Sequence, residues 1–258
     1  MIGHTNLDLL NCHVTDIDTA VSSLNDVVVR AGKDEDLSGS DIVIMAGGAP
    51  HQPSRKELLQ ANVPLIRGTA KKIERFCPDA VVITVTNPVD HLNYAMHLSS
   101  KLEPKRLIGY SLNDSIRFRM MVARALGVKS TQVEAIVMGE HTSNQVLLSS
   151  SIRVVGQPIS VGEDFKQSIL SEMANRYEPF RRAGRNSGWT SAVGLASIVS
   201  AITQDTKEII PCSAVLHGEY GCQELKLTPE EQRELENSIN ALKAIARSVE
   251  EVLGLSHF

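Results

Sequence analysis

The stretch Ser40-Asp-Ile-Val-Ile-Met-Ala-Gly-Gly-Ala-Pro50 decides the fold class. Its apolar run is too short for a helix and ends in two glycines and a proline, which is typical of a buried parallel strand that leads into a ligand-facing loop. A second run, Asp79-Ala-Val-Val-Ile-Thr-Val-Thr86, stops in the same way at Asn87-Pro88. Two such strands separated by a helix predict an α/β fold with a Rossmann-like parallel sheet.

The segments around these strands complete the plan of the first half. Ser54 stands three positions before Glu57, which is the capping-box pattern of a helix start, and apolar residues then recur at helical spacing through Ile73. Further elements are predicted from their local patterns: a short helix at 7–10, a strand at 25–30, a helix through Leu98, a strand at 105–109 and a helix at 115–126 that ends at Gly127.

The second half has a different character. Alternating apolar residues at 133–138 and 151–155 predict strands of an antiparallel sheet, and 164–182, 190–203 and 228–252 are predicted helices. We therefore expect a truncated Rossmann-like domain at 1–108 and an α+β domain at 109–258.

The composition of the chain excludes several classes of protein. The chain has 258 residues, 42% of them hydrophobic, and a formal net charge of −4 without a basic run, which argues against a nucleic-acid binder. No apolar stretch reaches the ~18 residues of a membrane span, and the first residues lack the pattern of a secretory leader. The four cysteines have no metal-ligand spacing and are expected to be reduced thiols. These features predict a cytoplasmic protein that acts on small molecules, without a metal.

His141 follows a strand-like segment and a glycine, a place where an imidazole can face a cleft. Histidine is the usual acid or base near neutral pH, but taken alone it is more often a structural residue. Asp114 and Arg117 share a helical face at i,i+3 spacing, so the carboxylate can orient an imidazole and the guanidinium can bind a carboxylate. The alternative is an exposed ion pair.

Two other polar residues stand next to predicted loops. Arg55 lies just after a proline-containing loop, which suits an arm that closes over an anionic substrate, although a solvated charge is the simpler interpretation. Asn87 ends the second buried strand, where loops at the carboxyl ends of parallel strands form a binding crevice. A turn asparagine before proline is equally consistent with the local sequence.

Several short motifs follow one another along the chain. They are Ala46-Gly47, Ser54-Arg55, Asn62, Val85-Thr-Asn-Pro-Val-Asp90, Asp114-Ser-Ile-Arg-Phe-Arg119, Gly139-Glu-His141 and Gly218-Glu-Tyr-Gly221. Together, these motifs closely resemble the lactate/malate dehydrogenase family. The resemblance covers nearly the whole chain, and although each motif alone is weak, their order and spacing are specific.

The resemblance implies an NAD-dependent oxidoreductase that transfers a hydride between the nucleotide and a small 2-hydroxy or 2-oxo acid. In the family's scheme His141 exchanges the hydroxyl proton, Asp114 orients it, Arg117 binds the substrate carboxylate and Arg55 polarises the carbonyl. Thr190 is similar to a position that lines the substrate pocket. Contacts with the cofactor fall to Gly47, Asn62, Val85 and Asn87, and Asn87 also contacts substrate.

The sequence departs from the family in several places. It contains no G-x-G-x-x-G turn, so we expect the first βαβ unit and its pyrophosphate cradle to be absent. The arm at 49–54 and the connection after Gly221 are also short, and Thr142-Ser143 follows His141 where the family generally has Gly-Asp. A non-catalytic family remnant that binds no dinucleotide is the rival prediction.

Substrate choice depends on the shortened arm. In the family the discriminating residue lies there, and either His51 or Gln52 takes that place in this chain. A protonated His51 suits a dicarboxylate, whereas Gln52 suits lactate. Because the arm leaves both possibilities open, malate is favoured over lactate mainly by the general resemblance of the sequence at 114–119 to that of malate dehydrogenases. A homodimer or homotetramer is also expected, because the strands at 42–45 and 81–85 would otherwise expose apolar surface.

Overall fold

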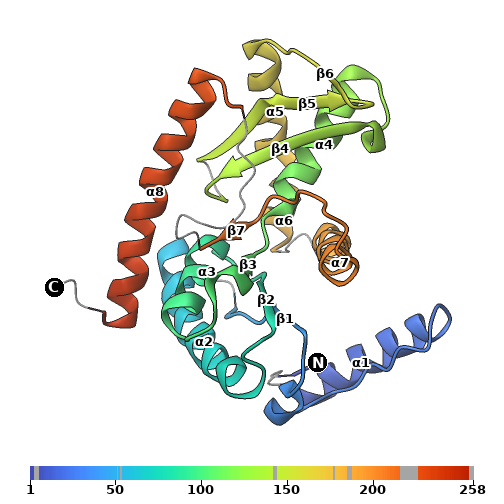
Figure 1. Cartoon of the computed structure of the whole chain (residues 1–258), viewed down its shortest axis with the longest axis vertical. Coiled ribbons are helices and arrows are strands. Elements are labelled where there is room, and N and C mark those ends of the chain that lie inside the picture. The colour runs from blue at the N-terminus through green and yellow to red at the C-terminus, as the bar shows by residue number, and fades with distance from the viewer. Residues whose placement is uncertain are drawn as a thin grey trace.

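The computed structural model describes residues 1–2, 6–50, 52, 54–141, 144–176, 178–184, 188–215 and 226–255. It contains a four-stranded sheet in the order β1-β2-β3-β7 and an antiparallel sheet in the order β4-β5-β6 (Figure 1). The strands are β1 (Ile42–Met45), β2 (Val81–Thr84), β3 (Leu107–Gly109), β4 (Val133–Gly139), β5 (Gln145–Val154), β6 (Gln157–Pro158) and β7 (Ser213–Ala214).

The helices surround these two sheets. The α-helices are α1 (Leu7–Ser22), α2 (Arg55–Phe76), α3 (Val89–Leu98), α4 (Leu112–Leu126), α5 (Glu163–Arg176), α6 (Glu178–Ala183), α7 (Gly188–Gln204) and α8 (Pro229–Leu253), and short 3₁₀ turns occur at Asp34–Leu37, Pro104–Arg106 and Ser130–Gln132. None of the helices within the described residues combines the length and the apolar content needed to cross a bilayer.

The first sheet confirms the predicted α/β fold. β1 pairs with β2 in parallel, with Ile42 opposite Val81, and β2 pairs in parallel with β3. β7 arrives from the far part of the chain and pairs antiparallel with β3. The outer edge of β1 has no partner strand among the described residues, and Ile44 on that strand is 44% exposed.

The helix that follows β1 forms as its sequence predicts. Ser54 is the N-cap of α2, its Oγ accepts a hydrogen bond from the Glu57 amide at 3.2 Å, and the same hydroxyl donates to the Glu57 carboxylate at 2.7 Å. The helix buries Leu59, Val63, Ile66, Ala70 and Ile73, whose spacing places them on one face against β2 and α3. This packing fixes the loops at the carboxyl ends of β1 and β2.

The second sheet packs against α4 and α5. Its core holds apolar residues of all three elements, among them Phe118 and Met121 of α4, Leu147 of β5 and Ile169 of α5. Gly127 ends α4 with φ +68°, the left-handed conformation that favours glycine, as the sequence predicts. The last helix, α8, runs along both halves of the molecule and contacts α2 and α3 as well as β4 and β5 (Figure 1).

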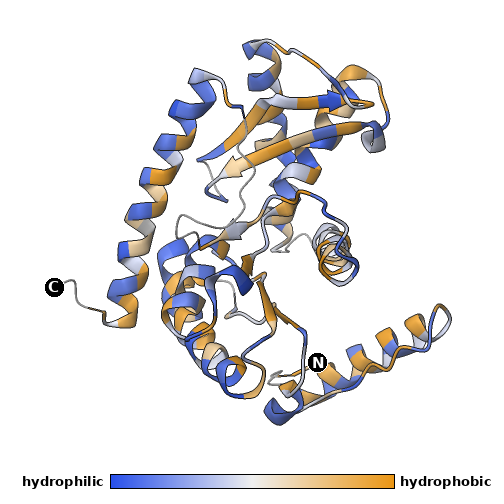
Figure 2. Cartoon of the chain, viewed as in Figure 1, coloured by the Kyte–Doolittle hydropathy of each residue, from blue (hydrophilic) through white to orange (hydrophobic). Residues whose placement is uncertain are grey.

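Three predicted elements differ from the structure. The predicted strand at 25–30 has no regular secondary structure, and Val28 there is 82% exposed, because among the described residues no strand lies beside it to complete a ladder. The predicted short helix at 7–10 continues to Ser22, and α1 projects from the molecule with an apolar stripe along it (Figures 1 and 2). The single helix predicted at 164–182 is instead assigned as α5 and α6.

Candidate active site

His141 and Asp114 form the centre of a buried polar cluster. Asp114 lies in the first turn of α4 and is 5% exposed, while His141 comes just after β4. The Asp114 Oδ2 atom lies 2.5 Å from His141 Nδ1. The carboxylate therefore fixes the ring orientation and leaves Nε2 as the nitrogen that can exchange a proton with a ligand.

The two residues meet because α4 is tied to β4 beside them. The Val137 amide of β4 donates to Ser115 Oγ of α4 at 3.0 Å, and Arg119 Nε donates to the Ala135 carbonyl at 3.2 Å. Both bonds lie within a few residues of the pair. The geometry of the His141–Asp114 pair is thus set by the packing of α4 on β4.

Arg117 lies one turn along α4 from Asp114. Its Nη1 donates to Asp114 Oδ1 at 3.0 Å, and its side chain is 11% exposed. The simpler interpretation, an exposed ion pair, is therefore wrong for this residue. A largely buried guanidinium next to this His–Asp pair is well suited to bind a carboxylate.

Two acidic residues that the sequence analysis left without a role complete the cluster. The Asp90 carboxylate, in the first turn of α3, accepts a hydrogen bond from the His141 amide at 2.8 Å. Glu140 is 5% exposed, forms an ion pair with Arg55 at 3.5 Å and accepts from Asn144 at 2.6 Å. Both stand inside recognised motifs, but only the fold reveals what they contact.

The pKa of His141 reflects competing effects. Burial lowers it, whereas the hydrogen bond and the charge of Asp114, helped by the charge of Asp90, raise it, and Arg117 opposes them weakly. The net result is a pKa above the usual histidine value. The imidazole therefore stays protonated to higher pH, in the form that can donate a proton to a carbonyl oxygen.

A second group of predicted residues lies in the loops after β1 and β2. The Thr86 hydroxyl donates to the Gly47 carbonyl at 2.7 Å, and Val85 donates its amide to the Met45 carbonyl at 2.8 Å. The buried Asn62 amide accepts from the Ala49 amide at 2.7 Å and donates to the Asn87 carbonyl at 2.8 Å. The Asn62 side chain thus links the two loops by hydrogen bonds to their backbones.

These loops fit the nicotinamide end of a dinucleotide. Gly47 is exposed, and a Cβ there would meet only the Met45 side chain at 3.7 Å, so the backbone is open to a ligand. Gly48 lies so close to Thr86 that a Cβ would come within 2.9 Å of its methyl group. Beside the outer edge of β1 the described residues provide no further strand.

Thr190 is held near the start of α4 by the first turn of α7. Tyr110 Oη donates to Asn113 Oδ1 at 2.7 Å and approaches the Thr190 carbonyl at 3.5 Å. Asn113 in turn donates to Ser191 Oγ at 2.9 Å. These bonds place Thr190 next to the helix end that carries Asp114.

Not all predicted residues join one site. His141, Asp114 and Arg117 are in direct contact, Arg55 reaches them through Glu140, and the β1 and β2 loops connect to them through the first turn of α3. His51 and the motif at 218–221 lie outside the described residues. Gln52, the alternative to His51, donates its side-chain amide to the Pro50 carbonyl at 3.0 Å.

His91 of α3 adds a buried imidazole next to the site. It is 6% exposed, and among the described residues its Nδ1 has no hydrogen-bond partner. Burial, assisted by the charge of Arg55 and opposed by Glu140, lowers its pKa to about 4. As the pH falls, the unfolded chain therefore binds a proton at this residue before the folded chain does.

We expect His91→Leu to reduce the acid sensitivity of the protein. Between pH 6.5 and 4 the wild type loses up to roughly 3 kcal/mol of stability through this histidine, because each pKa unit corresponds to about 1.4 kcal/mol. Urea unfolding at pH 7 and pH 4.5 measures the difference for both proteins. His13→Gln on the exposed face of α1 is the control. Equal acid losses in wild type and His91→Leu would contradict the prediction.

The parallel sheet, the loops at its carboxyl ends and the adjacent His–Asp–Arg cluster define a dehydrogenase-type α/β enzyme. Two family models match the chain: "lactate/malate dehydrogenase, NAD binding domain" over residues 6–109 and "lactate/malate dehydrogenase, alpha/beta C-terminal domain" over residues 112–228. The chain belongs to the lactate/malate dehydrogenase family. The predicted family, its NAD-dependent enzyme class and its two-part fold are confirmed.

Individual relatives agree with the family models. Malate dehydrogenase 2 of Rhodopseudomonas palustris is 31% identical over 258 residues, covering 88% of this chain and 80% of the relative. The malate dehydrogenase structure from Aeropyrum pernix has a TM-score of 0.82 at 30% identity and covers 92% and 86% of the two chains. A Cryptosporidium parvum lactate dehydrogenase complexed with lactic acid and the dinucleotide has a TM-score of 0.84 at 27% identity, with 92% and 85% covered.

Proposed function

We propose that this chain reduces a 2-oxo acid and oxidises the matching 2-hydroxy acid with NAD, with oxaloacetate and malate as the favoured pair. The observation that carries the proposal is the contact of His141 with Asp114 at 2.5 Å, with Arg117 bonded to the same carboxylate. Nicotinamide, when bound at the loops after β1 and β2, supplies or accepts the hydride.

Each side chain of the cluster has a distinct role in this proposal. His141 donates a proton to the carbonyl oxygen in reduction and removes it from the hydroxyl in oxidation. Arg117 fixes the substrate carboxylate, so that the reacting carbon faces the imidazole. Arg55, now paired with Glu140, is the second cation and stabilises the oxygen on which negative charge develops.

The preference for malate rests on the relatives. The relatives found by sequence similarity carry the name malate dehydrogenase, whereas the structural neighbours include both malate and lactate dehydrogenases. A dicarboxylate needs one more cation than a monocarboxylate does. His51 remains our proposed source of that cation, and Thr190 our proposed contact in the substrate pocket.

Steady-state kinetics tests the substrate proposal. The loss of NADH absorbance is followed with oxaloacetate and with pyruvate over a range of concentrations and pH. A higher kcat/KM for oxaloacetate supports malate as the physiological product, and a higher value for pyruvate identifies a lactate dehydrogenase. In either case the rate of reduction falls as the pH rises through the raised pKa of His141, because the proton donor is then lost.

The second candidate function is a non-catalytic family member that binds no dinucleotide. It is favoured by the lack of a G-x-G-x-x-G turn in the 258 residues and by the unpaired outer edge of β1 within the described structure. Calorimetric titration with NADH separates the candidates. Saturable binding supports the enzyme, whereas no detectable heat, together with no turnover, supports the non-catalytic protein.

We also propose that the protein is a homodimer or a homotetramer. Leu7 and Ile17 on α1 are 67% and 40% exposed, and Trp189 and Val193 on α7 are 83% and 67% exposed. Soluble monomers rarely leave apolar patches above a few hundred Å² in water. Association through the faces of α1 and α7 would cover these side chains (Figure 2).

Light scattering coupled to size exclusion is expected to give a mass of at least twice the 28.1 kDa of one chain. Trp189→Ser is expected to weaken association, because it removes the most exposed large apolar side chain on α7. Lys207→Ser, at an exposed polar position, serves as the control. A monodisperse species of one chain mass at micromolar concentration would contradict the proposal.

Two further parts of the proposal concern organisation and location. We place the boundary between the cofactor part, 1–108, and the substrate part, 109–258, at Gly109, near the point where the two family models meet. We place the enzyme in the cytoplasm, where thiols such as those of Cys12 and Cys77 stay reduced. Limited proteolysis and fractionation of cells that produce the protein test these statements.

A further inference from the structure

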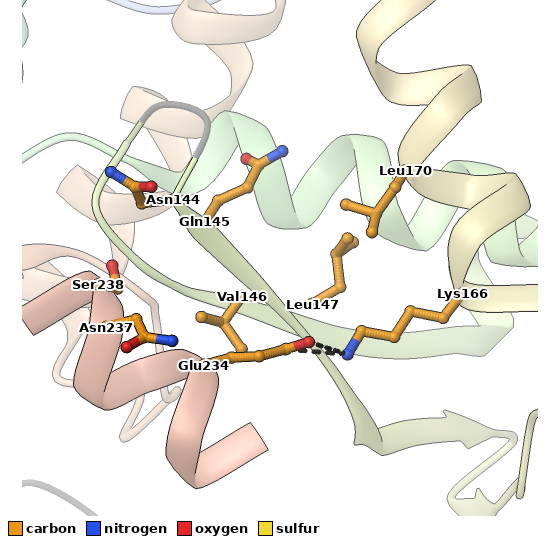
Figure 3. Close-up of a pocket in the computed structure, with 9 residues that line it drawn as sticks. All are labelled: Asn144, Gln145, Val146, Leu147, Lys166, Leu170, Glu234, Asn237 and Ser238. Atoms are coloured by element: carbon orange, nitrogen blue, oxygen red, sulfur yellow. Dashed lines mark hydrogen bonds and ion pairs between the residues drawn. The ribbon is translucent and has the colours of Figure 1, made fainter. Parts of the chain in front are cut away.

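One face of α8 is attached to β5 and α5 by polar side chains. Glu231 accepts from the Ser150 amide at 2.9 Å and from its hydroxyl at 2.7 Å. One turn on, Glu234 accepts from Lys166 Nζ at 2.7 and 2.9 Å (Figure 3). Glu231 and Lys166 are only 2% and 5% exposed, so these contacts fix the position of α8 along its axis relative to β5 and α5.

The next residue on this face reaches the loop that carries His141. Ser238 is 1% exposed, and its Oγ accepts a hydrogen bond from the Glu140 amide at 2.7 Å. In Figure 3 it projects from α8 on the side of Asn144, which follows that loop. Two consecutive amides, those of Glu140 and His141, are thus held by side chains from two different helices, Ser238 of α8 and Asp90 of α3.

The backbone next to Ser238 has a glycine, Gly139, at the point of closest approach. Gly139 has φ +82°, which favours glycine, and a Cβ on it would lie only 2.5 Å from Ser238 Oγ. The hydroxyl therefore occupies the space that any other residue at 139 would need.

We propose that Ser238 is a positioning residue for the dehydrogenase reaction, which holds the Glu140–His141 backbone so that the imidazole stays opposite Asp114. This inference rests on the proposed function for its activity readout. Ser238 does not touch substrate. It acts through the backbone amide next to His141. The contacts of Glu231 and Glu234 fix the position of α8 and therefore the position of the Ser238 hydroxyl.

Ser238→Ala leaves the Glu140 amide buried without this acceptor, so the loop shifts toward another partner. We expect kcat for oxaloacetate reduction to fall about tenfold, while the KM for substrate changes by less than about twofold, because Arg117 is positioned by α4. The groups that face His141 are Asp114, Asp90 and Arg117. As the contact with Asp114 loosens, the pKa of His141 falls, because the hydrogen bond and the charge of Asp114 are what raise it.

The matched control is Tyr94→Phe. Tyr94 Oη donates to Glu250 at 2.8 Å, so this variant loosens α8 at a site about 18 Å further along the helix. We expect it to lower the melting temperature about as much as Ser238→Ala does and to leave kcat and the pH profile unchanged. Equal kinetic effects of the two variants, or no effect of Ser238→Ala, would overturn the proposal.

A titration without turnover separates this proposal from the proposed function. The His141 imidazole signals, assigned by their loss in His141→Asn, are followed by NMR against pH in wild type, Ser238→Ala and Tyr94→Phe. A lower His141 pKa in Ser238→Ala alone supports the positioning role even where oxaloacetate and pyruvate are not reduced. An unchanged pKa in Ser238→Ala overturns it even where the wild type is active.

Discussion

Replacing His141 by asparagine is expected to reduce kcat for the preferred 2-oxo acid by about 10³-fold, within the range for loss of a general acid or base. The asparagine amide can still donate to Asp114, which lies 2.5 Å from the imidazole in the wild type, so the surrounding structure is retained. What is lost is the group that exchanges a proton with the substrate oxygen.

The measurement is stopped-flow and steady-state reduction with saturating NADH, with the melting temperature as a check on folding. The binding of NADH should change little, because among the described residues the bond that links the histidine to this part of the fold is the one from its backbone amide to Asp90 in the first turn of α3, and the substitution keeps that amide. His13→Gln on α1 controls for the loss of one histidine. A His141→Asn enzyme within tenfold of the wild-type rate would exclude His141 as the acid–base group.

Replacing Asp114 by asparagine is expected to have a second large effect, on both activity and stability. An amide cannot balance an imidazolium, so the pKa of His141 falls and its tautomer is no longer fixed, which costs about 10²- to 10⁴-fold in kcat. The guanidinium of Arg117, 11% exposed, also loses its carboxylate partner. Breaking such a largely buried pair costs about 3 kcal/mol of unfolding free energy.

Urea unfolding and the pH dependence of kcat/KM measure these two effects. Asp205→Asn is a matched control, because its ion pair with Lys207 has side chains that are 75% and 79% exposed and is expected to contribute little. The double variant Asp114→Asn, His141→Asn should be about as slow as the slower single variant, since the two residues act as one unit. Additive losses in the double variant would show that they act independently.

The sequence predicts the first sheet well, because its strands carry their own signal. The apolar run at 81–84 is almost entirely buried, the run at 42–45 is half-buried apart from the exposed Ile44, and Ser54 and Gly127 mark helix ends by local chemistry. The pairing of β7 with β3 could not be predicted, since a two-residue strand has no pattern and its partner lies a hundred residues away along the chain.

The same difference between local and tertiary signals applies to the site. The sequence draws attention to residue types that are common in acid–base catalysis and anion binding, namely His141, Asp114, Arg117 and Arg55. The motifs around them indicate the family. Asp90 and Ser238 look like an ordinary helix-start aspartate and a helical serine. Their roles depend on which backbone amides the tertiary packing brings to them, which no spacing in the sequence records.

The position of α8 also has a consequence for how the protein is made. Val249 of this helix is fully buried in the same apolar core as Ile66, Leu92 and Leu107 of the first half, and Val252 and Leu253 pack against that core. A ribosome releases the sheet strands of that half long before it releases α8. The nascent first half therefore cannot complete its own interior until synthesis has passed Leu253, and it must wait in an unfinished state that exposes apolar surface to chaperones.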